Sequence, residues 1–422
     1  MKKKFKIGII GLGYVGLPVC LSFAKKYETI GYDIDKDKIN LLTSKYKGNK
    51  KNLKFEIDIT KLKTCNIYIV IVPTPVDSHN IPDLSLLKKA CENLGKIISK
   101  SDIIIFESTV YPGVTEDICG KILSQKSKLK LINERNKNKF GDGFYLGYSP
   151  ERINPGDSSK DFEKINKIVA CSTHEQSLII CSLYQSILKS KVYIVESIKV
   201  AESAKIIENI QRDVNIALIN ELAMLFSKLG LNTESILKAA ETKWNFASFR
   251  PGLVGGHCIG VDPYYLTYKA SEIGFDTEII TKGRKINNQM PSYVASEFVK
   301  MLKKKKITIL NPNILILGFA FKEDFDDIRN TKVFDLYREL IDYGCKVDIF
   351  DPIVSKINCK KEYNVDIINE PNTNQYDGVI IAVKHNAFKE IGINKIRRWL
   401  KPKNIIYDLK YLFDKNLVDL RI

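Results

Sequence analysis

The side chain with the strongest signs of reactivity in this 422-residue sequence is Cys258, in the run Gly255-Gly-His-Cys-Ile-Gly-Val-Asp-Pro263. Small neighbours leave room for a substrate to approach the thiol, and backbone amides can lower a thiol pKa. The carboxylate of Asp262 follows four residues later. Together these residues suit covalent catalysis by a thiolate, which His257 could help to form. The run alone also fits a core cysteine beside a histidine that packs a turn.

A glycine-rich turn near the start of the chain has the spacing of a dinucleotide-binding site. Gly11, Gly13 and Gly16 spell G-x-G-x-x-G between an expected strand at Lys6–Ile10 and an apolar segment that reaches about Lys26. In such turns the first glycine permits the tight bend, the second lets a pyrophosphate approach the backbone, and the third lets the helix pack on the strand. The phosphate then faces the N-terminus of the helix. A purely structural glycine turn is the alternative.

Asp33 comes directly after the next expected strand, Glu28–Tyr32. A carboxylate at this position can accept hydrogen bonds from the ribose hydroxyls, which favours NAD over NADP. Lys38 could reach the ribose or a phosphate on the adenosine side, and a solvated lysine is the alternative. The pattern therefore predicts an NAD-binding domain.

A long helix is expected over Val200–Gly230, where apolar residues recur at helical spacing. Lys205 and Asn209 share one face of it, with Arg212 one turn further on. An amide beside an apolar stripe needs a hydrogen-bond partner if it is buried. An exposed polar face is the alternative. Such a helix could join two domains, and its length would suit a dimer contact.

Two loops carry further candidates. In Tyr148–Gly156, proline and glycine fix an extended segment with Glu151 and Arg152 at its turn. In Gly318–Arg329, Lys322 suits a phosphate and the guanidinium at the end of the run suits a bidentate contact. The second loop follows a strand, at the edge of an open α/β sheet where ligands bind. A plain surface loop and a salt-bridged loop are the respective alternatives.

Buried strands and helices alternate along the chain and must position these residues. Continuous apolar runs at Asn66–Val72 and Asp102–Glu107 are typical of strands buried on both faces of a parallel sheet. We predict an α/β fold with two Rossmann-like doubly wound domains, joined by a long central helix and a small helical domain. The expected domains are 1–197, 198–303 and 304–422, with Lys303–Lys306 as a solvated linker. The expected elements of the last domain are the strands Asn313–Gly318, Lys346–Phe350, Gly378–Val383 and Asn404–Tyr407 and the helix Thr331–Tyr343.

Composition narrows the function classes. The chain is 44% hydrophobic and 27% charged, which argues against disorder, and no apolar run approaches the ~20 residues that cross a bilayer. The start lacks a signal peptide, so we expect a cytoplasmic protein. Nine scattered cysteines without a C-x-x-C pair argue against a disulfide framework and a metal site. The formal net charge of +17 comes from lysines spread along the chain, which suits a solvated surface and a field that attracts anionic substrates rather than a nucleic-acid patch.

Taken in order, the motifs resemble the nucleotide-sugar 6-dehydrogenase family, which includes UDP-glucose and UDP-N-acetylhexosamine dehydrogenases. The matching stretches are GLGYVGLP, PTP, STVYPG, SPERINPG, AESAKIIEN, PGLVGGHCIGVDP and GFAFKEDFDDIRNTKV, and they cover nearly the whole chain. The resemblance implies NAD-dependent, four-electron oxidation of the C6 alcohol of a UDP-sugar to a carboxylate. It also implies a supply of precursors for capsule or other surface polysaccharides. The length of the expected helix leads us to expect a homodimer.

The SPERINPGD and GGHCIGVDPYYL stretches look closer to the N-acetylhexosamine branch of this family. Pro155 stands where UDP-glucose dehydrogenases tend to carry a second glutamate. We therefore expect UDP-N-acetylglucosamine first, then the galactosamine or mannosamine epimers, and then UDP-glucose. A two-electron hydroxyacid dehydrogenase and a non-catalytic, basic nucleotide-binding protein are the rival hypotheses.

The resemblance also assigns roles to residues. It implies that Cys258 is the nucleophile, that Lys205 and Asn209 stabilise oxyanion charge, and that Asp262, Glu151 and Thr109 hold water and assist proton transfer. The implied contacts to NAD are Gly11, Gly13, Tyr14, Val15, Gly16, Asp33, Lys38, Thr74, Ser108, Thr109 and Arg329. The implied contacts to the UDP-sugar are Glu151, Arg152, Ile153, Lys205, Asn209, Arg212, Arg250, Gly255, Tyr265, Lys322 and Lys410, the last where the family often has an arginine.

Overall fold

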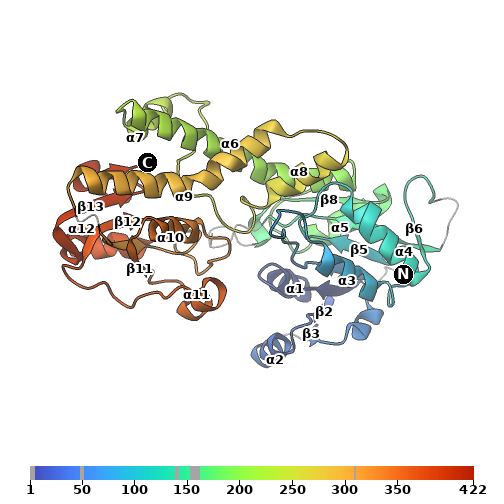
Figure 1. Cartoon of the computed structure of the whole chain (residues 1–422). Helices are drawn as coiled ribbons and strands as arrows, with labels where there is room; N and C mark the ends of the chain where they lie inside the picture. The colour runs from blue at the N-terminus through green and yellow to red at the C-terminus, as the bar shows by residue number, and fades with distance from the viewer. Residues whose placement is uncertain (1–4, 48–51, 138–141, 153–161, 308–309) are drawn as a thin grey trace. The chain divides into compact units, whose positions relative to one another are not determined.

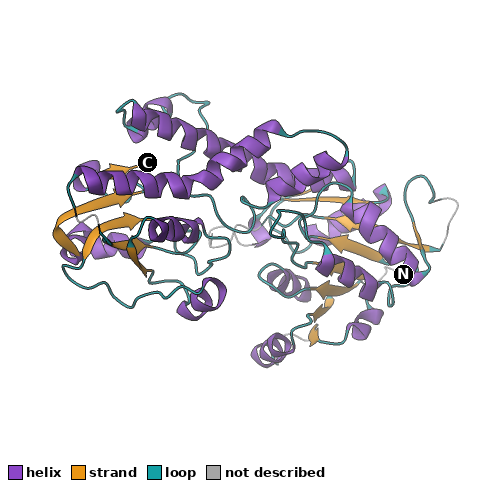
Figure 2. Cartoon of the chain, viewed as in Figure 1, coloured by secondary structure: helices purple, strands orange, loops and turns teal. Residues whose placement is uncertain are grey.

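The computed structural model of the chain describes residues 5–47, 52–137, 142–152, 162–307 and 310–422 (Figure 1). The described residues form two compact units. Unit 1 comprises Met1–Glu208 and Tyr264–Phe275, and unit 2 comprises Asn209–Pro263 and Asp276–Ile422. The expected division into three domains stays a prediction. The fold class is confirmed, because each unit is built on a largely parallel sheet with helices between its strands (Figure 2).

The sheet of unit 1 has nine strands in the order β3-β2-β1-β4-β5-β7-β8-β9, with β6 paired to β7. All these pairs are parallel except β7 with β8. The order reverses between β1 and β4, the switch point at which doubly wound sheets bind ligands. The strands are β1 (Lys6–Ile10), β2 (Glu28–Tyr32), β3 (Leu53–Glu56), β4 (Ile67–Val70), β5 (Ile103–Phe106), β6 (Lys130–Leu131), β7 (Gly143–Tyr148), β8 (Lys167–Cys171) and β9 (Val192–Ile194).

Helices pack on this sheet through alternate strand residues. Ile7 and Ile9 of β1 form one core with Ile67 and Ile69 of β4 and with Phe23 of α1. Both central strands β4 and β5 are buried throughout, as their unbroken apolar sequences predict. The helices of unit 1 are α1 (Gly16–Ala24), α2 (Lys36–Lys45), α3 (Ser85–Leu94), α4 (Gly120–Ser127) and α5 (His174–Gln185), with short turns η1 (Ile59–Thr64), η2 (Val114–Cys119) and η3 (Phe162–Lys164).

The sheet of unit 2 has five parallel strands in the order β11-β10-β12-β13-β14. Ile314 and Ile316 of β10 face one core, which includes Phe298 of α9, whereas Leu315 and Leu317 face another. Both faces of the sheet are therefore covered, as in a doubly wound fold. The elements are β10 (Asn313–Leu317), β11 (Lys346–Phe350), β12 (Tyr376–Ile381), β13 (Leu400–Asp408), β14 (Leu420–Arg421), α7 (Thr233–Ala240), α10 (Lys332–Asp342), α11 (Lys356–Tyr363), α12 (Asn386–Trp399) and η4 (Lys415–Leu417).

Three helices complete the chain. The predicted long helix is α6 (Ile198–Lys228), which begins in unit 1 and continues into unit 2, and α8 (Asp262–Glu272) begins in unit 2 and continues into unit 1. A second long helix, α9 (Glu278–Lys304), was not expected from the sequence, because it contains Pro291. Its buried residues recur every four positions and hold it on the core in spite of the proline, and they are Met290, Val294, Phe298 and Leu302.

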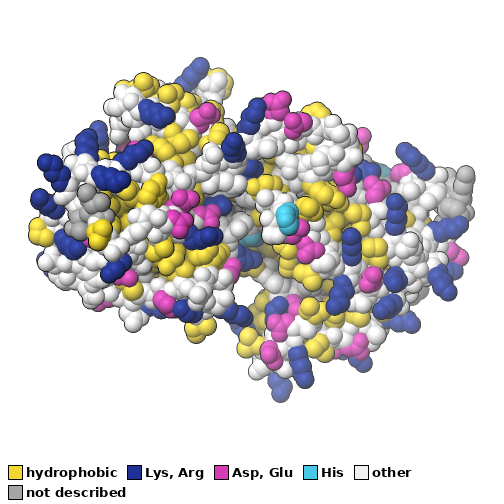
Figure 3. Space-filling view, viewed as in Figure 1, with side chains coloured by type: hydrophobic (Ala, Val, Ile, Leu, Met, Phe, Trp, Pro, Cys, Tyr) yellow, Lys and Arg dark blue, Asp and Glu magenta, His cyan; other side chains and the backbone are white. Residues whose placement is uncertain are grey.

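The expected linker at Lys303–Lys306 was wrong in its first half. Lys303 and Lys304 form the last turn of α9, where positive side chains favour the helix C-terminus. Over the described residues, no helix combines the length and the apolar character that a membrane span needs. Lysine and arginine side chains are scattered over the visible face of both units rather than gathered into one patch (Figure 3).

Candidate active site

The glycine turn between β1 and α1 has the geometry that a pyrophosphate site requires. Gly11 has a φ of +94°, and a Cβ atom there would lie 2.3 Å from the carbonyl oxygen of Ile71. A Cβ atom on Gly16 would lie 1.8 Å from the carbonyl oxygen of Gly11, so only glycine lets α1 start against this turn. A Cβ atom on Gly13 would have no atom within 4 Å, so the backbone there is open to a ligand. The turn therefore fits the dinucleotide that its sequence predicts.

Asp33 both holds this turn and stays available to a ribose. Its Oδ2 accepts the Leu12 N–H at 2.9 Å and the Lys38 ammonium at 3.0 Å, and its Oδ1 accepts the Asp35 N–H at 3.0 Å. Burial by itself would raise the pKa of this carboxyl, but these donors hold the pKa below its ordinary value. Asp33 is therefore ionised at neutral pH and remains an acceptor at the end of β2. Lys38 is paired with it rather than solvated alone.

Replacing Asp33 with Ala should weaken NAD binding by about tenfold or more, because a charge-assisted hydrogen bond to ribose is lost. Asp33→Asn should lose less, since it keeps an oxygen for the Leu12 N–H. The measurement is a fluorescence titration with NAD, with Asp37→Ala on the exposed start of α2 as the matched control. Unchanged NAD affinity in Asp33→Ala would remove Asp33 from the cofactor site.

The carboxyl ends of β4 and β5 lie beside the glycine turn and are tied together. Ser108 Oγ accepts the Val72 N–H at 3.0 Å and donates to the Val72 carbonyl at 2.7 Å, and Thr74 Oγ1 donates to the Thr109 carbonyl at 2.7 Å. Tyr265 is fully buried and its hydroxyl donates to the carbonyl of Thr74. The three polar residues predicted at the cofactor thus meet at one edge of the sheet. Tyr265 anchors this edge, and its contact to a UDP-sugar stays a prediction.

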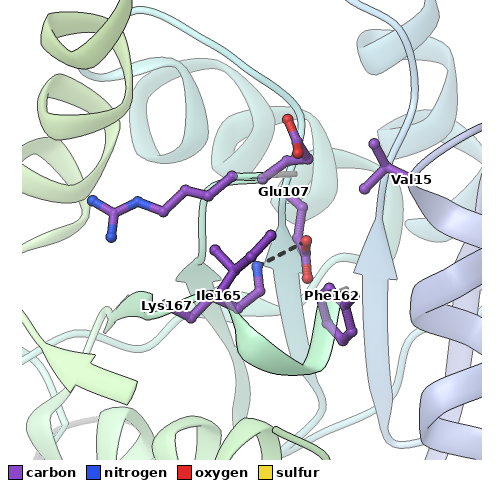
Figure 4. A pocket seen from close by; sticks show the side chains of 7 residues that line it. Val15, Glu107, Phe162, Ile165 and Lys167 are labelled. Carbon is purple, nitrogen blue, oxygen red and sulfur yellow. Dashed lines mark hydrogen bonds and ion pairs between the residues drawn. The ribbon is translucent and has the colours of Figure 1, made fainter. Parts of the chain in front are cut away.

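A small pocket of about 230 Å³, part of it open to solvent, lies between the glycine turn and the segment that follows β7. Val15 lines it from the turn, and Glu151 and Arg152 line it from the segment after β7. In Figure 4 the dashed contact joins Lys167 to Glu107 at this pocket. The remaining lining residues are Phe162 and Ile165. The pocket brings predicted cofactor and substrate contacts of unit 1 together.

The pair of Glu107 and Lys167 is a buried structural support that the sequence did not reveal. Their charged atoms are 2.9 Å apart, and Lys167 also donates to the carbonyls of Ser149 at 3.2 Å and Pro150 at 3.1 Å. The hydroxyl of Tyr184 donates to Glu107. Burial lowers the pKa of Lys167, and Glu107 opposes that shift. The pair thereby joins the carboxyl end of β5, shortly before Thr109, to the carboxyl end of β7, shortly before Glu151.

Removing one partner should destabilise the fold far more than removing both. Lys167→Met leaves the carboxylate of Glu107 buried without its cation, which typically costs about 3–5 kcal/mol. The double variant Glu107→Gln/Lys167→Met should recover much of this loss. Thermal unfolding of the full chain measures both variants, with Lys189→Met at an exposed position as the control. A melting temperature of Lys167→Met equal to the parent's would contradict the role of this pair.

In unit 2 the predicted nucleophile lies on a short, firmly held loop. Cys258 is partly exposed, whereas six of the other eight cysteines are buried. The carbonyl of Cys258 accepts the N–H groups of Val261 at 3.0 Å and Asp262 at 2.8 Å, which closes a turn into α8. A Cβ atom on Gly255 would lie 2.5 Å from the Asn330 carbonyl, so the loop is pressed against the segment before α10.

Two polar contacts link α6 to the predicted catalytic residues. Asn209 Nδ2 donates to Asp262 Oδ2 at 2.6 Å, and both residues are buried. Lys205, one turn earlier on α6, has its ammonium 3.7 Å from Glu151 Oε2, and both side chains are largely buried. The amide expected to need a partner therefore has one. The residues predicted for catalysis thus form two sets, with Cys258, Asn209 and Asp262 in unit 2 and Lys205, Glu151 and Thr109 in unit 1.

Four lysines line a hollow of unit 2 that encloses about 600 Å³, part of it open to solvent. Gly255, Lys322 and Lys410, all predicted at the substrate, lie on its wall. Lys332 and Lys384, which no sequence motif singled out, also line the hollow. Burial is the main cause that lowers the pKa of Lys410, and Lys384 lowers it further. This concentration of positive charge suits a di-anionic group such as a diphosphate.

Arg329 is held near the thiol loop. Its Nε donates to Asp327 Oδ1 at 2.9 Å, and this hydrogen bond is the main cause that raises the pKa of the guanidinium. Cys258 is a smaller cause of the same raised pKa. The predicted contact of Arg329 to NAD stays a prediction.

The other predicted residues lie elsewhere. Arg212 is exposed on α6, and Tyr14 is exposed on the glycine turn. Arg250 makes a bidentate ion pair with Glu241 in unit 2. Ile153 lies outside the described residues. Their substrate and cofactor contacts stay predictions.

Models of three consecutive domains match the chain. The NAD-binding domain of the UDP-glucose/GDP-mannose dehydrogenase family matches residues 5–188, its central domain matches residues 199–289, and its UDP-binding domain matches residues 315–415. The first match contains the glycine turn, the second contains α6 and the thiol loop, and the third contains most of the lysine hollow.

Curated relatives align with nearly the full length of this chain. The chain is 47% identical to a UDP-N-acetyl-D-glucosamine 6-dehydrogenase of Pseudomonas aeruginosa, with 100% of each chain covered. It is 43% identical to Protein CapL of Staphylococcus aureus, with 97% of this chain and 96% of that chain covered. Among solved structures, the UDP-D-ManNAc dehydrogenase of Pyrococcus horikoshii superposes with a TM-score of 0.85 at 29% identity, covering 97% and 96% of the two chains.

Proposed function

Because the chain belongs to the UDP-glucose/GDP-mannose dehydrogenase family, we propose that it oxidises C6 of a UDP-N-acetylhexosamine, with UDP-N-acetylglucosamine as the first substrate to test. The chain is an NAD-dependent dehydrogenase by membership of this family. The observation that carries the choice of chemistry lies in unit 2. Gly255, three residues before Cys258, lines the lysine hollow, so a sugar whose diphosphate is bound there starts close to the thiol.

The first oxidation converts the C6 alcohol to an aldehyde. An NAD+ bound at the glycine turn would accept the hydride from C6 in this step, and a second NAD+ that replaces the resulting NADH would accept the hydride of the second oxidation. A carboxylate, or a water that the Lys205 ammonium orients, takes the proton from the hydroxyl. Glu151 lies 3.7 Å from the Lys205 ammonium and orients it. Thr109, at the end of β5, helps to hold the water.

The thiolate of Cys258 then attacks the aldehyde carbon and forms a thiohemiacetal. Lys205 and Asn209 donate to the oxygen on which negative charge develops. Loss of the second hydride from C6 gives a thioester, in which the sulfur is a good leaving group. Asp262, held by Asn209, orients the water that cleaves this thioester to the carboxylate and restores the thiol. The substrate thus loses four electrons in two hydride steps.

We further propose that the chain functions as a homodimer through α6. Leu218 and Leu225 are about half exposed on this helix, and their spacing of seven residues puts them on one face. An isologous contact of two such faces would bury them. Light scattering after size exclusion should report a dimer, which Leu225→Glu should weaken. A monomeric parent protein would contradict the proposal.

The experiment that tests the function is a substrate panel. The purified chain is mixed with NAD+ and each of the UDP derivatives of N-acetylglucosamine, N-acetylgalactosamine, N-acetylmannosamine and glucose, and absorbance of NADH is followed. The fastest turnover is expected with UDP-N-acetylglucosamine. Preference for UDP-glucose, or no NADH production with any of the four UDP-sugars, would overturn the substrate assignment. The product would serve as a precursor of surface polysaccharide.

A further inference from the structure

The two Rossmann-like modules each contain a glycine turn of the same conformation. Gly11 and Gly318 have φ angles of +94° and +93°, and they follow β1 and β10, respectively. The Gly11 N–H donates to the Tyr32 carbonyl at 2.9 Å, and the Gly318 N–H donates to the Phe350 carbonyl at 2.9 Å. In both modules an aspartate follows the neighbouring strand. Differences at this aspartate therefore show how the second module departs from a dinucleotide site.

Asp351, the counterpart of Asp33, is fully occupied by protein donors. Its Oδ2 accepts the N–H groups of Phe319 at 2.6 Å and Ala320 at 3.1 Å, and its Oδ1 accepts those of Ile353 at 2.8 Å and Val354 at 3.2 Å. Burial alone would raise the pKa of this carboxyl, but His385 and these donors hold it at about 2. Asp351 is only 2% exposed. Its oxygens are committed to the fold rather than to a ribose.

His385 is the additional partner of Asp351, and it is completely buried. Its Nε2 lies 3.1 Å from Asp351 Oδ2, and its Nδ1 accepts the backbone N–H of Asp324 at 2.9 Å. Because Nδ1 accepts a hydrogen bond from the Asp324 N–H, the ring N–H lies on Nε2 and points to Asp351. The ring also packs on Phe388, with 5.4 Å between ring centroids. Its orientation is thus fixed on three sides.

This histidine joins the two segments that carry lysines into the hollow. Lys322 and Glu323 stand immediately before Asp324, and Lys384 stands immediately before His385, and all three flanking residues line the hollow. Asp324 has a left-handed backbone, with φ of +53°, which a non-glycine residue adopts only when its surroundings hold it. The hydrogen bond from the Asp324 N–H to His385 supplies part of that restraint.

We propose that His385 is a positioning residue for the diphosphate of the nucleotide sugar, because its Nδ1 holds the Lys322 segment at a fixed distance from Lys384. The inference rests on the proposed function, in which the lysine hollow receives that diphosphate. Loss of the Nδ1 contact should let the Lys322 segment leave its left-handed conformation. Affinity for UDP should then fall, whereas NAD affinity, which depends on unit 1, should not change.

Three substitutions separate the two nitrogen atoms of the ring. In His385→Asn the side-chain oxygen replaces Nδ1 as acceptor for the Asp324 N–H. In His385→Gln the amide reaches the Nε2 position and keeps the donor to Asp351 only. In His385→Leu both contacts are lost. We expect UDP affinity near the parent value in His385→Asn and about tenfold weaker in His385→Gln and His385→Leu, as loss of one buried hydrogen bond implies.

The measurement is calorimetric titration of the full chain with UDP and, separately, with NAD, together with KM and kcat for the UDP-sugar. The control is His174→Leu at the exposed start of α5. A rise in KM for the UDP-sugar with kcat and NAD affinity unchanged supports the proposal. The proposal is overturned if His385→Leu binds UDP as tightly as the parent protein does. It is also overturned if all three variants lose UDP affinity equally, or if all three unfold. If the parent protein binds UDP but oxidises no UDP-sugar, the proposed function fails. The UDP titrations of the three variants then still test the role of His385.

Discussion

Replacing Cys258 with Ala should abolish formation of the acid while NAD and UDP still bind. The nucleophile enters only at the aldehyde stage, and loss of a covalent nucleophile typically costs at least ~10³-fold in turnover. The thiol is partly exposed on the loop from Gly255 to Asp262, so loss of its sulfur atom leaves no cavity in a core. We therefore expect the melting temperature of the variant to match that of the parent.

The measurement is the rate of carboxylate formation by mass spectrometry, alongside titrations with NAD and UDP. Cys181→Ala is the matched control, because Cys181 is also partly exposed but lies on α5 with its thiol 3.7 Å from the Val192 carbonyl. Its turnover should equal that of the parent. Acid formation by Cys258→Ala at the parent rate would exclude the thioester route.

Replacing Lys205 with Met should lower kcat by about 100- to 1000-fold, the usual effect of removing one donor from an oxyanion site. Methionine keeps the unbranched stem but removes the charge that lies 3.7 Å from Glu151. Because the lysine acts on the reacting oxygen, KM for the UDP-sugar should change far less than kcat. A pre-steady-state measurement of NADH formation should show the first hydride step slowed as well, since the same ammonium assists the first proton transfer.

Lys199→Met is the control for this variant. Lys199 lies on the same helix, is half exposed and pairs with Asp117 at 3.1 Å, so its loss should leave kcat unchanged. A kcat within about threefold of the parent's in Lys205→Met would contradict the assignment, because even one ordinary hydrogen bond is worth more than that. An effect on KM alone would make Lys205 a substrate-binding residue.

Much of the fold could be predicted because strands buried on both faces have unbroken apolar sequences. The bounds expected for Lys6–Ile10, Glu28–Tyr32 and Lys346–Phe350 are those of β1, β2 and β11. Helix α9 could not be predicted in the same way, since Pro291 interrupts its pattern and its stability comes from packing on the core of unit 2. Tertiary burial decided the outcome there against local propensity.

The site was predictable where its residues form contiguous motifs. Gly255, Lys322 and Lys410 could be proposed for the substrate, and they line one hollow. Lys384 and His385 could not, because a lysine and a histidine after a strand have no distinctive spacing. Their position follows from topology, since the carboxyl ends of parallel strands meet at one edge of a sheet. Lys384 directly follows the expected strand Gly378–Val383, and that placement was the available signal.

The buried pair of Glu107 and Lys167 at the unit 1 pocket could not be predicted from the sequence either. Glu107 ends an apolar run and Lys167 begins another, and the two are sixty residues apart in sequence. Each looks like an ordinary charged residue at a strand end. Only the pairing of β5, β7 and β8 in one sheet brings them to 2.9 Å. Long-range contacts of this kind carry no local sequence signal.

In the proposed reaction, one chain carries its substrate through two hydride transfers at the same carbon. The most direct test of this reaction is the yield of NADH from a limiting, weighed amount of UDP-N-acetylglucosamine, measured to completion with excess NAD+. We expect two NADH per sugar and a uronic acid as the sole product. A yield of one NADH, with an aldehyde or ketone left in solution, would contradict the proposed reaction.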